Sequence, residues 1–246
     1  MKKIVLALFL FWPSYAATIH SGGVDILKKM YTRYHGKWYK TLSFNQSTEM
    51  YRHDSLMRTE IWYENIQFPD DFRIDFGHPD SGNAVIFKRD SAFVFRNGIQ
   101  AEVRVSEDDL LFLLGGLYFY PFDTVVAKMT GFGYDLDQFR EDTWKGRPVY
   151  VIGASNQRDS LNQLWVEKEN YCPVRLIKFS GEGKQEALFE NHVKLGGGFT
   201  ETLVHFFIND QLIQVEKYHD LRGDGLIDRR IFDTEKFVTL KRQVKK

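Results

Sequence analysis

Cysteine is almost absent from this chain. Cys172 is the only cysteine among 246 residues, so no internal disulfide and no C-x-x-C redox pair can form. A chain of this length buries enough surface to fold without such bridges. Cys172 stands in "NYCPVRLIKF", where its simplest interpretation is a small apolar residue at the start of a strand.

The chain also has no excess of charge of either sign. Lys and Arg together number 33, and Asp and Glu together number 33. This balance provides no long-range field that would attract nucleic acid or anionic lipid headgroups. We therefore expect no nucleic-acid partner.

Long apolar runs are missing as well, since none reaches the roughly twenty residues that cross a bilayer as a helix. The chain opens "MKKIVLALFLFWPSYAA", with two lysines, an apolar run from Ile4 to Trp12, and small residues around Ala16. We interpret residues 1–16 as a secretory signal peptide cleaved after Ala16. An N-terminal membrane anchor is the alternative, but the apolar run is short for it. We expect residues 17–246 to act outside the cytoplasm.

Catalytic and metal-binding motifs are also lacking. The sequence contains no G-x-S-x-G, no H-E-x-x-H and no phosphate-binding glycine loop. "DLRGDGLIDRRI" resembles a calcium loop, but Arg222 and Ile231 stand where carboxylate ligands belong, which favours a polar turn. His192 and His205 fall in strand-like segments without a third ligand. We expect no enzyme, no cofactor and no metal site.

What the sequence does contain is clear periodicity. "SGGVDILKKMYTRYHGK" carries apolar residues at i, i+3 and i+4, which predicts one amphipathic helix that ends before Gly36. From Trp38 onward the period changes to two. In "DFRIDFG", for example, Phe72, Ile74 and Phe76 alternate with charged residues.

Many further short segments alternate in the same way. They are separated by Gly, Pro, Asn and Asp, including the turn dipeptides "RD" and "NG". Strands are predicted in residues 83–105, 147–155, 161–169, 173–181, 186–196, 200–210 and 211–220. This pattern predicts a mainly β (α+β) fold in which one antiparallel sheet, in a single domain of residues 17–246, curls into an open or closed barrel.

An apolar segment, "LLFLLGGLYFYPF" in residues 110–122, interrupts the strands at the centre of the chain. Ser106 followed by three acidic residues predicts a helix from Ser106 to about Gly115. A second helix is predicted from Pro121 to Gly131. The segment either fills the curved sheet as permanent core or covers a ligand cavity as a movable lid. Truncating Leu114 or Phe119 should separate these alternatives.

The order of these elements resembles the LolA/LolB-like lipoprotein-carrier superfamily, and in particular outer-membrane lipoprotein-sorting proteins. The resemblance is carried by "YHGKWYKTLSFNQST", "TEIWYENIQFPDDFRIDF", "LLFLLGGLYFYPFD", "EDTWKGRPVYVIGA" and "LWVEKENYCPVRL". These are packing and turn patterns, not catalytic signatures. In the carriers a basic residue precedes a proline after the second long strand, whereas this chain has Gln67 and Phe68 before Pro69.

The resemblance implies an unclosed antiparallel barrel with an N-terminal helix and a central helical lid over an apolar cavity. It implies a non-catalytic periplasmic carrier that binds lipoprotein acyl chains or another lipid, with transfer proteins of the inner and outer membranes as partners. A protein-interaction or sensor module on the same fold is the alternative. The implied cavity and lid residues are Trp62, Phe72, Ile74, Phe76, Phe87, Phe93, Phe95, Leu110, Leu111, Leu113, Leu114, Tyr118, Phe119 and Phe122.

Overall fold

The structure is a computed structural model that describes residues 22–106, 109–157, 160–181 and 183–239. The predicted signal peptide, residues 1–16, lies outside the described residues, so its cleavage stays a prediction. Within the described part of the chain, no helix is long and apolar enough to cross a membrane.

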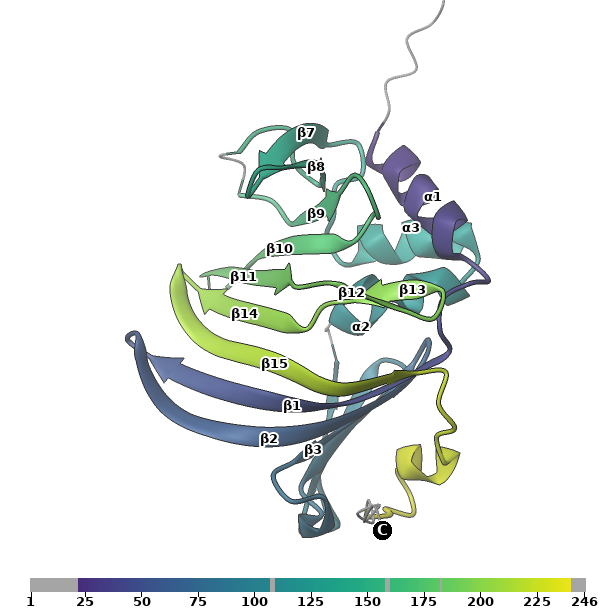
Figure 1. Cartoon of the computed structure of the whole chain (residues 1–246), viewed down its shortest axis with the longest axis vertical. Coiled ribbons are helices and arrows are strands. Elements are labelled where there is room, and N and C mark those ends of the chain that lie inside the picture. The colour runs from purple at the N-terminus through teal and green to yellow at the C-terminus, as the bar shows by residue number, and fades with distance from the viewer. Residues whose placement is uncertain (1–21, 107–108, 158–159, 182, 240–246) are drawn as a thin grey trace, which may run out of the picture.

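One large antiparallel sheet dominates the fold (Figure 1). Within the described residues it has 13 strands, in the spatial order β6 (Ile99–Val105), β5 (Ser91–Arg96), β4 (Ala84–Lys88), β3 (Asp71–Phe76), β2 (Ser55–Gln67), β1 (Thr41–Arg52), β15 (Gln211–Gly223), β14 (Leu203–Ile208), β11 (Gly183–Glu190), β10 (Pro173–Ser180), β9 (Gln163–Glu167), β8 (Arg147–Ile152) and β7 (Phe139–Trp144). The end strands β6 and β7 do not pair with each other. The curved sheet is therefore open, which confirms the mainly β class and the unclosed barrel.

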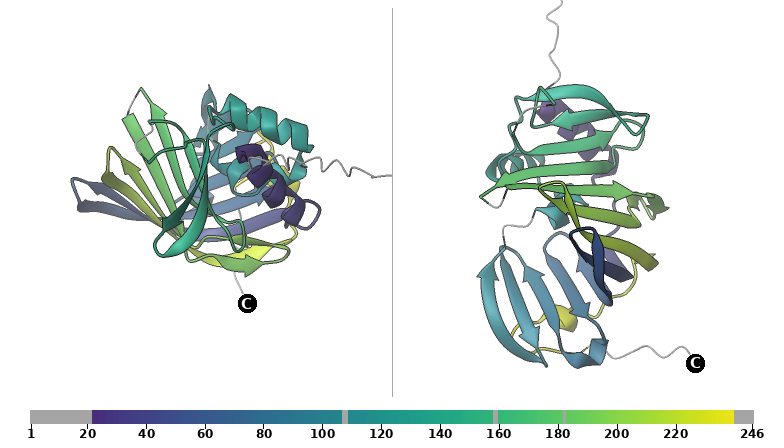
Figure 2. Two further views of the ribbon diagram at one scale, coloured as in Figure 1. Left: turned by 90° about the horizontal axis from the view of Figure 1, so that it is seen from above. Right: turned by 90° about the vertical axis from the view of Figure 1, so that its left-hand side faces the viewer.

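The three α-helices of the described residues lie inside the curve of the sheet (Figure 2). The α-helices are α1 (Gly23–Tyr34), α2 (Leu110–Leu113) and α3 (Phe122–Gly131), and the short 3-10 helices are η1 (Pro79–Ser81), η2 (Gly116–Phe119) and η3 (Arg229–Phe232). Helix α1 buries Leu27, Met30 and Tyr31 in the core inside the sheet, as its apolar spacing predicted. Helix α3 begins directly after Pro121, which confirms the second central helix.

The first central helix is much shorter than predicted. Helix α2 begins at Leu110 and not at Ser106, while residues 107–108 lie outside the described residues. Asp109 occupies the N-cap position without capping the helix. Its buried carboxylate instead accepts hydrogen bonds from Tyr134 Oη at 2.8 Å and from Lys178 Nζ at 3.0 Å. These tertiary partners, rather than local capping, decide where the helix begins.

Two predicted strands are broken in the structure. Residues 186–196 are divided between β11 and β12 (Val193–Leu195), and residues 200–210 between β13 (Gly198–Thr200) and β14. Strands β12 and β13 pair only with each other, as a small separate hairpin. Strand β7 was not predicted, because its sequence "FREDTW" is mostly polar and lacks an apolar face.

The calcium-like motif is not a loop in the structure. Strand β15 continues to Gly223, so Asp220 and Arg222 belong to the strand. The Asp224 carboxylate accepts a hydrogen bond from the backbone N–H of Lys40 at 2.8 Å. The polar turn that we predicted after this strand therefore starts only at residue 224.

The outer face of β3 is covered by the segment that follows β15. Arg73 is fully buried there and forms an ion pair with Asp75 at 2.6 Å. Its Nη1 donates to the carbonyls of Ile231 and Val238, at 2.8 Å each. Residues 229–238 are thus fastened to the side of the sheet that faces away from the helices.

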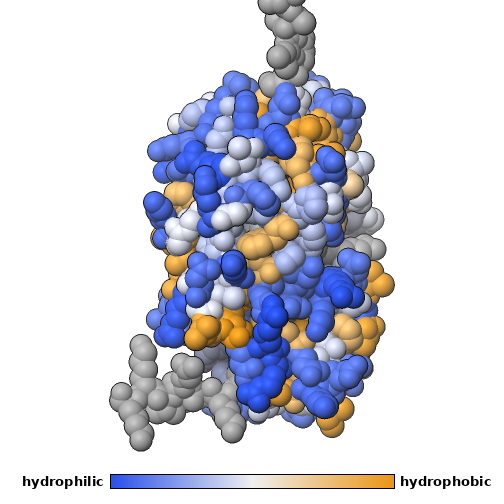
Figure 3. Space-filling model, turned by 90° about the vertical axis from the view of Figure 1, so that its right-hand side faces the viewer, coloured by the Kyte–Doolittle hydropathy of each residue, from blue (hydrophilic) through white to orange (hydrophobic). Residues whose placement is uncertain are grey.

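On the face shown in Figure 3, apolar residues form several separate patches between hydrophilic side chains. A further apolar surface, the lining of a cavity, lies inside the curve of the sheet.

Candidate functional site

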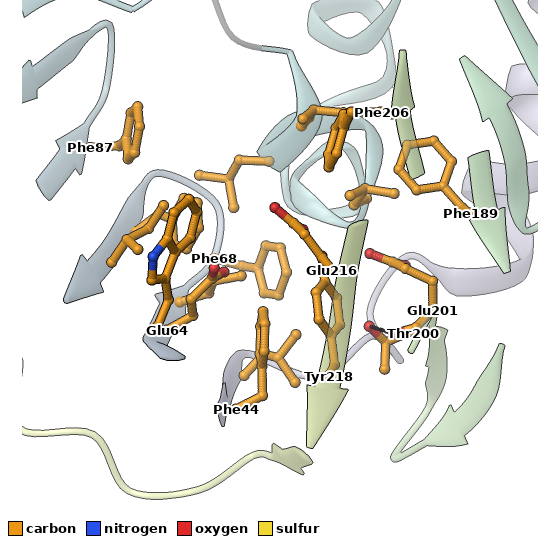
Figure 4. A pocket seen from close by; sticks show the side chains of 18 of the residues that line it. Phe44, Glu64, Phe68, Phe87, Phe189, Thr200, Glu201, Phe206, Glu216 and Tyr218 are labelled. Atoms are coloured by element: carbon orange, nitrogen blue, oxygen red, sulfur yellow. Dashed lines mark hydrogen bonds between the residues drawn. The ribbon is translucent and has the colours of Figure 1, made fainter. Parts of the chain in front are cut away.

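A cavity of about 340 Å³ lies between the inner face of the sheet and helix α2 (Figure 4). This volume falls in the range of about 300–1,000 Å³ that small-molecule sites occupy. The cavity is lined by Leu42, Phe44, Trp62, Glu64, Ile66, Phe68, Phe72, Ile74, Phe87, Arg89, Ser106, Leu110, Leu111, Leu114, Phe189, Thr200, Glu201, Phe206, Gln214, Glu216 and Tyr218.

Strand alternation explains why the strand residues point into the cavity. Successive side chains of a strand face opposite sides of the sheet, so Phe72 and Ile74 of β3 face inward while Arg73 faces outward. On β2 the inward residues are Trp62, Glu64 and Ile66. Ile61, an apolar residue of the same strand, is 43% exposed on the other face.

Helix α2 and the residue after it provide the opposite wall. Leu110, Leu111 and Leu114 line the cavity and are only partly buried. Phe112 and Leu113 lie on the other side of the turn and are buried in the core. A helical period of 3.6 residues separates the leucine side chains into these two groups.

The predicted site residues divide into two sets. Those that line the cavity are Trp62, Phe72, Ile74, Phe87, Leu110, Leu111 and Leu114. Those that lie elsewhere are Phe76, Phe93, Phe95, Leu113, Tyr118, Phe119 and Phe122. The binding role of the first set stays a prediction.

Phe93 and Phe95 lie on the outer side of the sheet. Phe95 is buried against Phe237 of the covering segment, with ring centroids 4.5 Å apart. Phe93 pairs across the strands with Ile86, whereas Phe87 pairs with Ala92 on the inner face. Alternating aromatic residues show that a strand has one apolar face. They do not show whether that face points into the curve of the sheet or away from it.

The other misplaced residues pack beside the cavity rather than in its wall. Phe76 contacts Trp62 edge-on, and Phe119 stacks behind Phe68 with centroids 5.5 Å apart. Phe122 packs against Tyr31 of α1. Leu113 and Tyr118 are fully buried core residues.

The second half of the central apolar segment is fixed to α1 and the residues that follow it. Tyr31 Oη donates to the carbonyl of Tyr120 at 2.9 Å, and His35 Nδ1 bonds the carbonyl of Tyr118 at 2.8 Å. A side chain at Gly115 would place its Cβ 2.5 Å from Nε1 of Trp38. Residues 115–120 therefore pack with the core, and Leu110, Leu111 and Leu114 have the position expected of a lid.

Sequence reasoning missed the acidic side chains of the cavity. Glu64, Glu201 and Glu216 are 5%, 6% and 7% exposed and line the same apolar cavity. A signal did exist for Glu64, because it stands two residues after Trp62 and two before Ile66 on the inward face of β2. An acidic residue at an inward position of an apolar strand is a reason to suspect a site.

Burial changes the acidity of these groups. Desolvation raises the pKa of Glu64 well above its usual value of 4.5, and the charges of Glu216 and Glu201 raise it further. Desolvation raises the pKa of Glu201 to about 7, in spite of a hydrogen bond from its own backbone N–H, and Glu216 adds to the rise. Both carboxyl groups therefore keep their protons to a higher pH than exposed glutamates do.

The two histidines noted in the sequence, His192 and His205, have different surroundings. His192 lies outside the strands, between β11 and β12, and His205 Nδ1 is 3.1 Å from the carboxylate of Glu190. In the described ranges, no group of three His, Cys, Asp or Glu side chains is placed to hold a metal ion.

An open antiparallel half-barrel with helices in its curve is a fold known from solved structures. A DUF1329 family protein from Desulfovibrio piger superposes with a TM-score of 0.60 at 16% identity, over 86% of this chain and 95% of the other. A LolA superfamily protein from Nitrosomonas europaea superposes with a TM-score of 0.58 at 17% sequence identity, over 87% of this chain and 98% of the other. A "putative outer membrane lipoprotein-sorting protein domain" from Vibrio parahaemolyticus superposes with a TM-score of 0.60 at 11% sequence identity, over 87% of this chain and 97% of the other.

These likenesses confirm the LolA-like fold that the sequence resemblance implied. At such low identity they concern the fold alone. No protein-family model and no curated protein sequence matches the chain.

Proposed function

We propose that this protein is a non-catalytic lipid-binding carrier that holds acyl chains in the cavity between the sheet and helix α2. The observation that supports the proposal is the cavity of about 340 Å³ with its aromatic and aliphatic walls. Burying an acyl chain there removes apolar surface from water at about 25 cal/mol per Å². The half-barrel fold, shared with a domain named for outer membrane lipoprotein sorting, supports the same class of cargo.

The proposal includes a place of action. Removal of residues 1–16 would release residues 17–246 into the periplasm, where lipoproteins or lipids pass between the membranes. Transfer proteins of the inner and outer membranes are then the partners that would load and unload the cavity.

The test is binding of a neutral fluorescent apolar probe, N-phenyl-1-naphthylamine, to delipidated protein. Ile74→Trp would fill part of the cavity and should weaken probe binding by about tenfold or more, the loss that about 1.4 kcal/mol produces. Ile61→Trp, on the exposed face of a neighbouring strand, is the matched control and should leave affinity unchanged. If the unaltered protein neither binds the probe nor carries lipid when isolated from the envelope, the proposal fails.

A second candidate is a protein-interaction module, which the edge strand β6 favours. Within the described residues β6 ends the sheet, and Ile99, Val103 and Val105 are 72%, 50% and 75% exposed. Such an edge can pair with an extended segment of another protein. A stoichiometric protein partner that is lost when Val103 is replaced with Pro, with no lipid in the cavity, would favour this function over the first.

A further inference from the structure

Three acidic side chains meet in the apolar cavity from three separate parts of the chain. Glu64 projects from β2, Glu216 from β15, and Glu201 from the connection between β13 and β14 (Figure 4). Each is more than nine-tenths buried. An apolar cavity for acyl chains alone would have no need of them, because burying a carboxyl group without a partner is unfavourable.

The partners of these groups inside the protein are few. Glu216 accepts hydrogen bonds from Gln214 Nε2 at 2.6 Å and from Tyr218 Oη at 2.9 Å. Glu64 has no hydrogen-bond or ion-pair partner among the described residues. Its cross-strand neighbours are Phe44 and Ile74, which are both apolar.

No basic side chain is among the charges that act on Glu64 or Glu201. Arg89 is the basic residue of the cavity lining, but it is exposed in the turn after β4, and its charge acts on Asp71. The charges that act on Glu64 are those of Glu216 and Glu201, and the charge that acts on Glu201 is that of Glu216.

We propose that the ligand of this cavity is a cationic amphiphile, whose protonated amine binds Glu64, Glu201 and Glu216 while its hydrocarbon chain lies among the leucine and phenylalanine side chains. This inference rests on the proposed lipid-binding function and specifies the chemical class of the ligand. The view in Figure 4 shows Phe87 well separated from Glu201, so the cavity offers apolar wall at a distance from the acidic group.

Binding an amine would offset the free-energy cost of burying the three carboxyl groups. An ammonium group has three donors, and hydrogen bonds between ionised partners are about twice as strong as neutral ones. Its charge would also favour the ionised form of the glutamates. Because the carboxyl pKa values are raised in the empty protein, binding an ammonium group should release protons from them.

The experiment compares three ligands with the same chain but different head groups: dodecylamine, dodecanol and dodecanoate. Each displaces N-phenyl-1-naphthylamine from the delipidated full chain, below its micelle concentration and at about pH 7.5. We expect dodecylamine to bind at least about tenfold more tightly than dodecanol, since a hydrogen bond to a charged group contributes that much. Dodecanoate should bind most weakly.

Glu64→Gln tests the acidic side chain with little change in its shape. The variant should keep the far-ultraviolet circular dichroism spectrum of the unaltered protein, which shows that it is folded, and its preference for the amine over dodecanol should fall to about threefold or less. Glu169→Gln, on the exposed turn after β9, is the matched control and should keep the full preference. In the unaltered protein the preference should also decline below about pH 6, where Glu201 is protonated.

The outcomes separate the two proposals. If all three ligands bind equally, or if Glu64→Gln leaves the amine preference intact, the cationic ligand is refuted and the lipid-binding function stands. If neither the probe nor any of the ligands binds, the lipid-binding function itself fails. Proton release on binding dodecylamine, measured calorimetrically in two buffers of different ionisation enthalpy, should be absent with dodecanol.

Discussion

Replacing Glu201 with Gln should stabilise the ligand-free protein at neutral and alkaline pH but not in acid. Glu201 is 6% exposed, and its carboxyl lies in the apolar cavity near Glu216. Gln has nearly the same shape and can accept the same backbone hydrogen bond. The substitution therefore removes the ability to ionise and little else.

The magnitude follows from the two pKa values of Glu201. Its pKa is about 7 in the folded protein and near the ordinary 4.5 when the chain is unfolded. Because the folded pKa is the higher one, the folded state binds the proton more tightly. The stabilisation from that proton is complete below about pH 4.5 and is lost as the pH rises through about 7. At 1.36 kcal/mol per pKa unit, the loss is about 3 kcal/mol at pH 8.

Urea unfolding followed by tryptophan fluorescence at about pH 4.5, 6 and 8 measures the effect. We expect the Gln variant to equal the unaltered protein at the lowest pH and to exceed it by up to about 3 kcal/mol at the highest. Glu169→Gln, at an exposed site, should stay within about 0.5 kcal/mol of the unaltered protein throughout. The reasoning is refuted if the difference produced by Glu201→Gln does not grow with pH.

Further substitutions test the central segment and the outer face. Leu117→Ala, in the buried second half of the segment, should cost about 2–5 kcal/mol of stability. Leu114→Ala, in the cavity wall, should weaken probe binding more than it weakens the fold. Equal losses of stability, with hydrogen exchange across residues 110–122 that follows global unfolding, would show that the whole segment is permanent core. Arg73→Met should cost about 3–5 kcal/mol, because it leaves the buried carboxylate of Asp75 unpaired. Adding Asp75→Leu should recover much of that loss in the same unfolding measurement, and no recovery would contradict this explanation.

The sequence alone was sufficient for the features that depend on local periodicity. The spacing of Leu27, Met30 and Tyr31 predicted helix α1, and the alternation of Phe72 and Ile74 predicted a strand with one apolar face. These predictions succeeded because each repeat is read within a few neighbouring residues. The order of helix, strands, central apolar segment and strands was enough to suggest the half-barrel.

The composition of the cavity was decided by tertiary structure. Glu64 and Glu216 are far apart in the sequence, and they meet because β15 pairs with β1, which in turn pairs with β2. Phe95 was expected inside but is covered from outside by residues 229–238, which alternation cannot reveal. Periodicity shows that a strand has two different faces, but only the long-range packing of strands, helices and covering segments decides which face encloses the cavity and which charges it contains.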